Sequence, residues 1–176
     1  MRIVPAIVVV GLLAACSPME HAPAVKFKDG ELPLPADYKS WPKFLTGIQR
    51  ADAKQVRDIY VNPKGYSSAK GQPFPNGTMF VMENYAALAN PDGTLQKDAS
   101  GKLVKGALLR AFVMGKGEGW GESAEIRNGD WVYASYGADG KATADPFVPC
   151  RACHLPLTSK DFVHRYDEYF EKRGGY

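Results

Sequence analysis

Four stretches of the chain group apolar, β-branched and aromatic residues in the way that strands do. Segments rich in Gly, Pro, Asn and Ser separate them, and the first of these, NPKGYSSAKGQPFPNG, is dense in turn formers. The pattern therefore predicts strands that are antiparallel neighbours in one sheet. The predicted strands are residues 57–61, 78–85, 107–114 and 130–136.

Helical periodicity is strong only near the C-terminus, in LTSKDFVHRYDEYFEKR (157–173). Thr158 with Asp161 three residues later forms a capping pattern, and the apolar residues that follow make one stripe at helical spacing. His164 falls nearly opposite that stripe, so we expect it to face solvent and not to bind a metal. Weaker helical patterns occur at residues 43–54 and 123–127. The predicted fold class is α+β, mainly β: a twisted antiparallel sheet with a few helices.

The length and composition are those of a globular chain with one core. The chain has 176 residues, of which 45% are hydrophobic and 11% aromatic, and these values argue against disorder. Its 22 Lys and Arg residues only slightly outnumber its 19 Asp and Glu residues, and the basic residues are scattered. The sequence therefore predicts no binding to nucleic acid.

The N-terminus reads as an export signal, because Arg2 precedes an apolar run that is too short to span a bilayer as a mature helix. The run ends in Leu-Ala-Ala-Cys16, which resembles a bacterial lipobox, in which the cysteine is acylated; an ordinary signal peptide cut near HAPA is the alternative. Ser17 follows where an Asp would favour the inner membrane. We therefore expect a periplasmic protein, lipid-anchored to the outer membrane at Cys16. The expected division is a signal peptide at 1–15, a linker at 16–35 and one domain at 36–176.

Two of the three cysteines lie in the motif C-R-A-C-H, where Cys150 and Cys153 precede His154. After export, the two thiols could form a disulfide. A thioredoxin-like motif needs a βαβ context, and a zinc site needs a fourth ligand. The same spacing is typical of covalent haem attachment, in which the thiols add to the haem vinyl groups and the adjacent imidazole binds iron. We expect one haem c near the C-terminus with His154 as its iron ligand, while thiol redox chemistry and zinc remain alternatives.

Five segments follow one another along the chain: KDGELPLPADYKSWPKF, RDIYVNPKGY, FPNGTMFVMENY, NGDWVYASYGADGK, and CRACH followed by KDFVHRY. In this order they resemble the cytochrome P-460 family, which includes the cytochromes c′-beta. The resemblance covers residues 28–172 and implies a cytochrome P-460-like haem domain in a β-rich homodimer, with a five-coordinate, His-ligated haem c. Members called cytochrome P-460 oxidise hydroxylamine.

One position departs from the family pattern. Cytochrome P-460 joins a lysine covalently to the porphyrin edge from the strand after a P-x-G-T turn, and the matching residue here is Met82, between Val81 and Glu83. A thioether cannot make that bond, so the resemblance supports the haem more strongly than hydroxylamine oxidation. Met82 could pack against the haem edge, bind iron as a sixth ligand, or be oxidised by peroxide chemistry. Strand alternation places Phe80 on the same face, as a candidate pocket wall.

Asp145 is the closest match to the carboxylate that family enzymes place shortly before the motif to handle protons. Asp before Pro is also a common turn element. Phe147 and Phe44 are further candidates for the pocket wall. The function classes left open are a haem enzyme acting on hydrogen peroxide or hydroxylamine, a nitric-oxide-binding cytochrome, and an electron carrier with Met82 on the iron. We expect peroxide turnover with Asp145 as acid and base, supplied with electrons by a redox partner such as a cytochrome.

Overall fold

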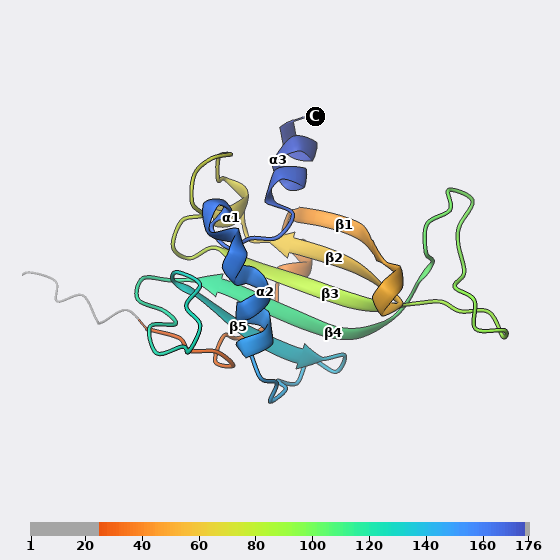
Figure 1. Ribbon diagram of the computed structural model, residues 1–176, viewed down its shortest axis with the longest axis horizontal. Helices are drawn as coiled ribbons and strands as arrows, with labels where there is room; N and C mark the ends of the chain where they lie inside the picture. The colour runs from red at the N-terminus through yellow and green to blue at the C-terminus, as the bar shows by residue number, and fades with distance from the viewer. Residues whose placement is uncertain (1–24, 175–176) are drawn as a thin grey trace, which may run out of the picture.

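The computed structural model describes residues 25–174, which form a five-stranded antiparallel sheet with short helices (Figure 1). Each strand pairs with the next one along the chain, so the sheet is a meander. The four predicted strands are confirmed as β2 to β5. The strands are β1 (Lys43–Arg50), β2 (Gln55–Val61), β3 (Met79–Ala87), β4 (Lys105–Lys116) and β5 (Trp131–Gly137). The predicted signal peptide and Cys16 lie outside the described residues.

The edge strand β1 corrects the weak helix expected at residues 43–54. Phe44, Leu45 and Ile48 are buried, and their spacing resembles one face of a helix. The register between β1 and β2 shifts between Leu45 and Ile48, where Gly47 has φ +62° and donates its N–H to Asp58 at 2.8 Å. An irregularity of this kind breaks the alternation of a strand and produces a helix-like pattern in the sequence. Only Ala51–Ala53 (η2) are helical, as one 3₁₀ turn.

The helices are short, and α2 lies across one face of the sheet in Figure 1. The helix expected at 157–173 is wrong in its first half, because Asp161, Phe162 and Arg165 have φ between 50° and 60°. The segment expected at 123–127 is a run of turns and bends. The helices are η1 (Tyr38–Ser40), α1 (Pro63–Tyr66), α2 (Val148–His154), η3 (Leu155–Lys160) and α3 (Tyr166–Gly174).

Asp161 explains where the expected C-terminal helix fails. Instead of lying in the first turn of a helix, its carboxylate accepts the N–H of Phe74 at 2.8 Å and the ammonium group of Lys116 at 2.8 Å. Both side chains of the Lys116–Asp161 pair are only 12% exposed. These tertiary contacts outweigh the local helical pattern, so α3 begins only at Tyr166.

The two sheet faces carry separate buried clusters. The cluster on the face covered by α3 is largely aromatic, and its members include Phe44, Phe74, Phe80, Trp131 and Tyr169. Residues 27–41 cover the other face, where Leu32 and Tyr38 pack against alternate strand residues. The neighbours Phe80 and Val81 belong to different clusters, as strand alternation requires.

A buried carboxylate lies on the face covered by residues 27–41. Glu83 is fully buried and accepts the hydroxyl groups of Tyr38 at 2.7 Å and Tyr85 at 2.6 Å. Lys39 lies 3.7 Å from the same carboxylate. Burial alone raises the pKa of Glu83, but these hydrogen bonds and the nearby charge outweigh it, so on balance the pKa is lowered. Glu83 therefore ties the N-terminal cover to the sheet as an ionised group.

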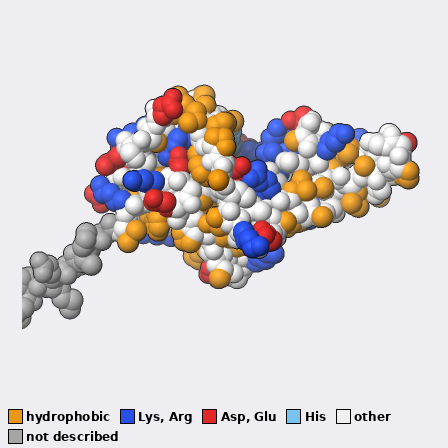
Figure 2. Space-filling view, turned by 90° about the horizontal axis from the view of Figure 1, so that it is seen from below, with side chains coloured by type: hydrophobic (Ala, Val, Ile, Leu, Met, Phe, Trp, Pro, Cys, Tyr) orange, Lys and Arg blue, Asp and Glu red, His pale blue; other side chains and the backbone are white. Residues whose placement is uncertain are grey.

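Residues 88–104 join β3 to β4 as an arm, closed by isolated bridges between Ala89 and Leu95 and between Lys97 and Leu103. The arm extends beyond the end of the sheet in Figure 1, and Figure 2 shows it standing apart from the main body. Within residues 25–174, no helix has the length and apolar character needed to cross a membrane.

Candidate functional site

A cavity of about 590 Å³ lies between the sheet and helix α2. All five strands contribute to its wall, and α2 and the turn after η3 complete it. The side chains that line it are mainly aliphatic or aromatic. A cavity of this size and character is typical of sites for small molecules and cofactors.

Helix α2 brings the C-R-A-C-H motif to this cavity. Cys150, Cys153 and His154 all line it, because positions i, i+3 and i+4 share one helix face. The two thiols are free, Cys150 half-buried and Cys153 exposed. Burial raises the pKa of the Cys150 thiol, so at neutral pH it is protonated.

The imidazole of His154 is held in one tautomer. Its Nδ1 lies 2.6 Å from the backbone carbonyl of Phe162, and since a carbonyl only accepts, Nδ1 carries the proton. Nε2 is then the basic nitrogen, as in histidines that bind metals. The ring packs against Tyr133 with centroids 5.3 Å apart, and burial lowers the pKa of His154 to about 4. The side chain is therefore neutral, which is the form that a metal ligand needs.

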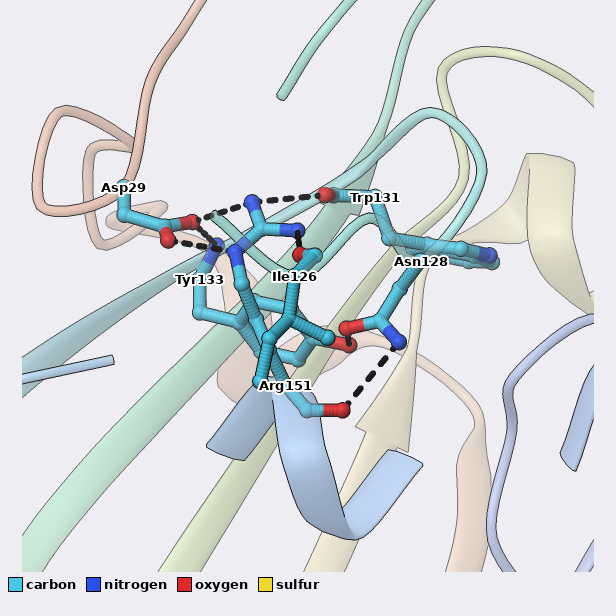
Figure 3. A network of polar contacts seen from close by, with 6 residues as sticks. All are labelled: Asp29, Ile126, Asn128, Trp131, Tyr133 and Arg151. Carbon is cyan, nitrogen blue, oxygen red and sulfur yellow. Dashed lines mark hydrogen bonds and ion pairs between the residues drawn. The ribbon is translucent and has the colours of Figure 1, made fainter. Parts of the chain in front are cut away.

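Arg151, inside the motif, fixes α2 from the other side of the helix (Figure 3). It is 1% exposed and donates to both carboxylate oxygens of Asp29, at 2.6 and 2.8 Å. Its remaining donors reach the backbone carbonyls of Ile126 at 3.1 Å and Trp131 at 3.2 Å. Sequence reasoning missed this role of Arg151. The signal that could have identified it is its place one residue after Cys150 on α2, because neighbouring helix positions point to different sides.

Asn128 adds a second connection between α2 and the sheet. Its amide donates to the backbone carbonyl of Arg151 at 3.2 Å, and its side-chain oxygen accepts the hydroxyl of Tyr133 at 3.1 Å (Figure 3). The backbone N–H of Tyr133 in turn donates to Asp29 at 3.0 Å. Tyr133 lines the cavity, so one network holds both α2 and the β5 residue that contacts His154.

The strands supply most of the other residues predicted for the site. Phe80 and Met82 line the cavity from β3, as their alternation predicts, and Phe44 does so from β1. Phe147 lines it just before α2. The structure therefore brings together seven of the eight predicted site residues around one cavity: Phe44, Phe80, Met82, Phe147, Cys150, Cys153 and His154.

Asp145, the eighth, does not line the cavity. It is held by the hydroxyl groups of Ser135 at 2.6 Å and Thr143 at 2.8 Å, and it pairs with Arg110. Ser135 lies next but one to Tyr133 on β5, so Asp145 lies near the cavity on the same sheet face. The hydrogen bonds from Ser135 and Thr143, followed by the charge of Arg110, lower the pKa of Asp145 and keep it ionised.

His164 also borders the cavity, on a turn and not on the expected helix. It is exposed, as expected, and its ring centroid lies 4.7 Å from that of His154. Its Nε2 is 3.5 Å from the sulfur of Cys153. Within residues 25–174, no three His, Cys, Asp or Glu side chains are arranged to hold a metal ion.

Three arginines, which sequence reasoning missed, also line the cavity: Arg50, Arg57 and Arg165. Arg50 pairs with Asp52 at 2.7 Å, and Arg165 pairs with Glu168 at 2.6 Å. Arg57 donates only to a neutral partner, the side-chain oxygen of Gln55, at 3.1 and 2.9 Å. Strand alternation places Arg57 on the same face as Ile59, which is the signal that could have identified it.

A family model described as Cytochrome P460 matches residues 35–165, most of the chain. The chain belongs to the cytochrome P460 family. No curated protein matches it. Membership in the cytochrome P460 family implies a haem cofactor.

The residues of the cavity fit such a cofactor. The mainly apolar walls suit a porphyrin ring, and the two free thiols of α2 face the same space as the imidazole. The tautomer of His154, fixed by Phe162, presents a basic Nε2. This cytochrome P460 chain therefore has a haem-compatible donor set in one cavity.

Proposed function

We propose that this chain is an exported haem c protein that reduces hydrogen peroxide with electrons from a donor. The observation that carries the proposal is the cavity in which the C-R-A-C-H motif faces a sheet without a histidine. Among the described residues, the only sulfur or imidazole groups on the strand side of the lining are Met82 and Met114. If neither thioether bound the iron, a bound haem would have room to take up a small molecule.

The residues of α2 would hold the cofactor. Cys150 and Cys153 would form thioether bonds, and Nε2 of His154 would bind the iron. When bound, the haem supplies redox chemistry and a coordination site for small oxygen or nitrogen species. Phe80, Met82 and Phe147 would exclude water from this space and pack against the ring.

Asp145 would handle the proton of the substrate. All three of its hydrogen bonds, from Arg110, Ser135 and Thr143, end on Oδ2, so Oδ1 is the atom that would take a proton. Because the pKa of Asp145 is lowered, its carboxylate is ionised at neutral pH, which is the form that can accept a proton. For one oxygen of hydrogen peroxide to leave as water, a proton must move to it from the other peroxide oxygen, and Asp145 would carry that proton.

A second candidate function is nitric oxide binding without turnover. The observation that favours it is the position of Asp145 beside the cavity and not in its wall. A wall of mainly apolar side chains suits a neutral diatomic gas better than a substrate that must exchange protons. Hydroxylamine oxidation is a third candidate function, suggested by the family resemblance, and Met82 in place of the lysine makes it the least favoured.

The experiment that separates these functions mixes the ferric protein with hydrogen peroxide and a reducing donor, beside parallel mixing with hydroxylamine and nitric oxide. We expect peroxide consumption that Asp145→Ala slows at least about tenfold, since general acid–base catalysis contributes about 10² to 10⁴ in rate. Met82→Leu, which keeps volume and removes the sulfur, serves as the matched control and should react at nearly the wild-type rate. Tight nitric oxide binding without peroxide consumption would replace this function with gas binding.

The cellular setting is proposed on the sequence alone. The leader supports export and a lipid anchor at Cys16 on the outer membrane, and the family resemblance supports a homodimer and a redox partner cytochrome. The attachment of the haem can be tested separately. Because Met82 cannot form the lysine cross-link to the porphyrin, mass mapping of the mature protein should find haem only on the peptide that contains Cys150. Haem joined also to a peptide from residues 71–97 would show that a second covalent link exists and would contradict this prediction.

A further inference from the structure

Arg57 is a half-buried cation without an anionic partner. Its Nε and Nη2 donate to the side-chain oxygen of Gln55 at 3.1 and 2.9 Å. Within residues 25–174, no carboxylate lies within 4 Å of its guanidinium group. A cation that is partly removed from water and paired only with a neutral group is costly, so a further partner would stabilise it.

The surroundings of Arg57 increase this cost. Its pKa is lowered by burial and by the like charges of Arg50 and Arg165. Those two arginines have their own carboxylates, Asp52 and Glu168. The cavity lining contains these three arginines and no lysine, aspartate or glutamate among the described residues. This end of the cavity therefore suits an anion.

Gln55 orients the guanidinium group. The amide of Asn84 on β3 donates to the side-chain oxygen of Gln55 at 3.3 Å. This hydrogen bond across the strand pair holds the Gln55 side chain in place. The Nε edge of Arg57 is taken by Gln55, and the other N–H groups on Nη1 and Nη2 remain for a second partner. A guanidinium group with one free edge matches a carboxylate through two parallel hydrogen bonds.

We infer that Arg57 binds a propionate carboxylate of the haem and that Gln55 positions it for that contact. The inference rests on the haem cofactor of the proposed function, but not on peroxide turnover. A haem presents an apolar ring with two carboxylates at one edge, and the cavity combines apolar walls with cationic side chains. Of the three arginines in the lining, Arg57 is the one with no carboxylate within 4 Å among residues 25–174, and the more distant Asp52 offsets its charge only in part.

The expected effect is on the reduction equilibrium of the iron. Removing the cation leaves a propionate charge unbalanced near the metal, and this favours the ferric state. Arg57→Gln should lower the equilibrium constant for reduction by at least tenfold, which is about 59 mV for one electron. Arg57→Lys keeps the charge and should recover most of the potential, but it loses the planar two-bond contact.

The test is potentiometric titration of the mature holoprotein. The matched control is Arg127→Gln, which removes the same charge from an exposed ion pair with Asp130, outside the cavity. The reduction potential should fall in Arg57→Gln and stay near the wild-type value in the control. A potential in Arg57→Gln no lower than that of the control would overturn the inference, whatever the protein does with peroxide.

A spectroscopic readout covers the case in which Arg57→Gln does not fold. The resonance Raman band from haem propionate bending responds to hydrogen bonding at the carboxylate. In Arg57→Lys this band should shift, because the two parallel hydrogen bonds are lost, while Arg127→Gln should leave it unchanged. An unchanged band in Arg57→Lys would show that Arg57 acts only within the protein and would refute propionate binding.

Discussion

Replacing Asp29 with Asn tests how helix α2 is held. The substitution keeps the size of the side chain but removes the charge that offsets Arg151, which is 1% exposed. Removing one partner of a buried ion pair costs about 3–5 kcal/mol, because the other charge is left uncompensated. Asp29 is 21% exposed, and two backbone carbonyls still accept from the guanidinium group. We therefore expect the lower end of that range, about 3 kcal/mol.

The assay is thermal unfolding of the mature protein, followed by circular dichroism. A chain of this size loses about 2–4 °C for each kcal/mol, so Tm should fall by about 6–12 °C. The control is Asp139→Asn, which breaks an exposed pair with Lys141 that is worth about 0–1 kcal/mol. A fall in Asp29→Asn no larger than in Asp139→Asn would refute the importance of the network.

Two further predictions concern Glu83 and His164. Because the pKa of Glu83 is lowered on folding, its contribution to stability is present above its usual value of 4.5 and is lost as the pH falls through the folded pKa. In urea unfolding at pH 7, Glu83→Gln should be less stable than the wild type by about 1–3 kcal/mol. This difference in the free energy of unfolding should narrow below pH 4.5. A difference that does not change with pH would contradict the prediction. His164→Ala should leave the visible spectrum of the ferric protein unchanged. The ring centroids of His154 and His164 are 4.7 Å apart. Two imidazoles bound to the same metal would lie farther apart, because two metal–nitrogen bonds of about 2 Å and the two ring radii separate their centroids. A change of spin state would show that His164 binds the iron.

The sheet could be predicted because its signals are local. Strands β2 to β5 carry β-branched and aromatic residues between dense turn segments, and each strand pairs with its neighbour along the chain. Strand β1 could not be predicted in this way, because the irregularity at Gly47 gives its buried residues helical spacing. The break in the C-terminal helix depends on Asp161, whose partners Phe74 and Lys116 are distant in sequence.

The candidate site likewise contains residues that the local sequence identifies and residues that distant partners position. The C-R-A-C-H motif is contiguous, so its spacing, together with the export signal, could indicate haem from the sequence. The groups that fix it are remote: Asp29 and Arg151 are 122 positions apart in the chain. The family resemblance pointed to Asp145 but not to its partners: Ser135, Thr143 and Arg110 hold it beside the cavity and not in its lining.

The register of strand β3 decides which of its residues line the cavity and which lie on the other face of the sheet. Met82 lines the cavity, whereas its neighbour Glu83 is fully buried on the other face under Tyr38. A slip of one residue would place the carboxylate in the mainly apolar cavity and the thioether among the tyrosine hydroxyls. The hydrogen bonds to Glu83 therefore stabilise the register that presents position 82 to the cavity. Because the register and not the side chain sets this position, a lysine at 82 would reach the same space as the methionine.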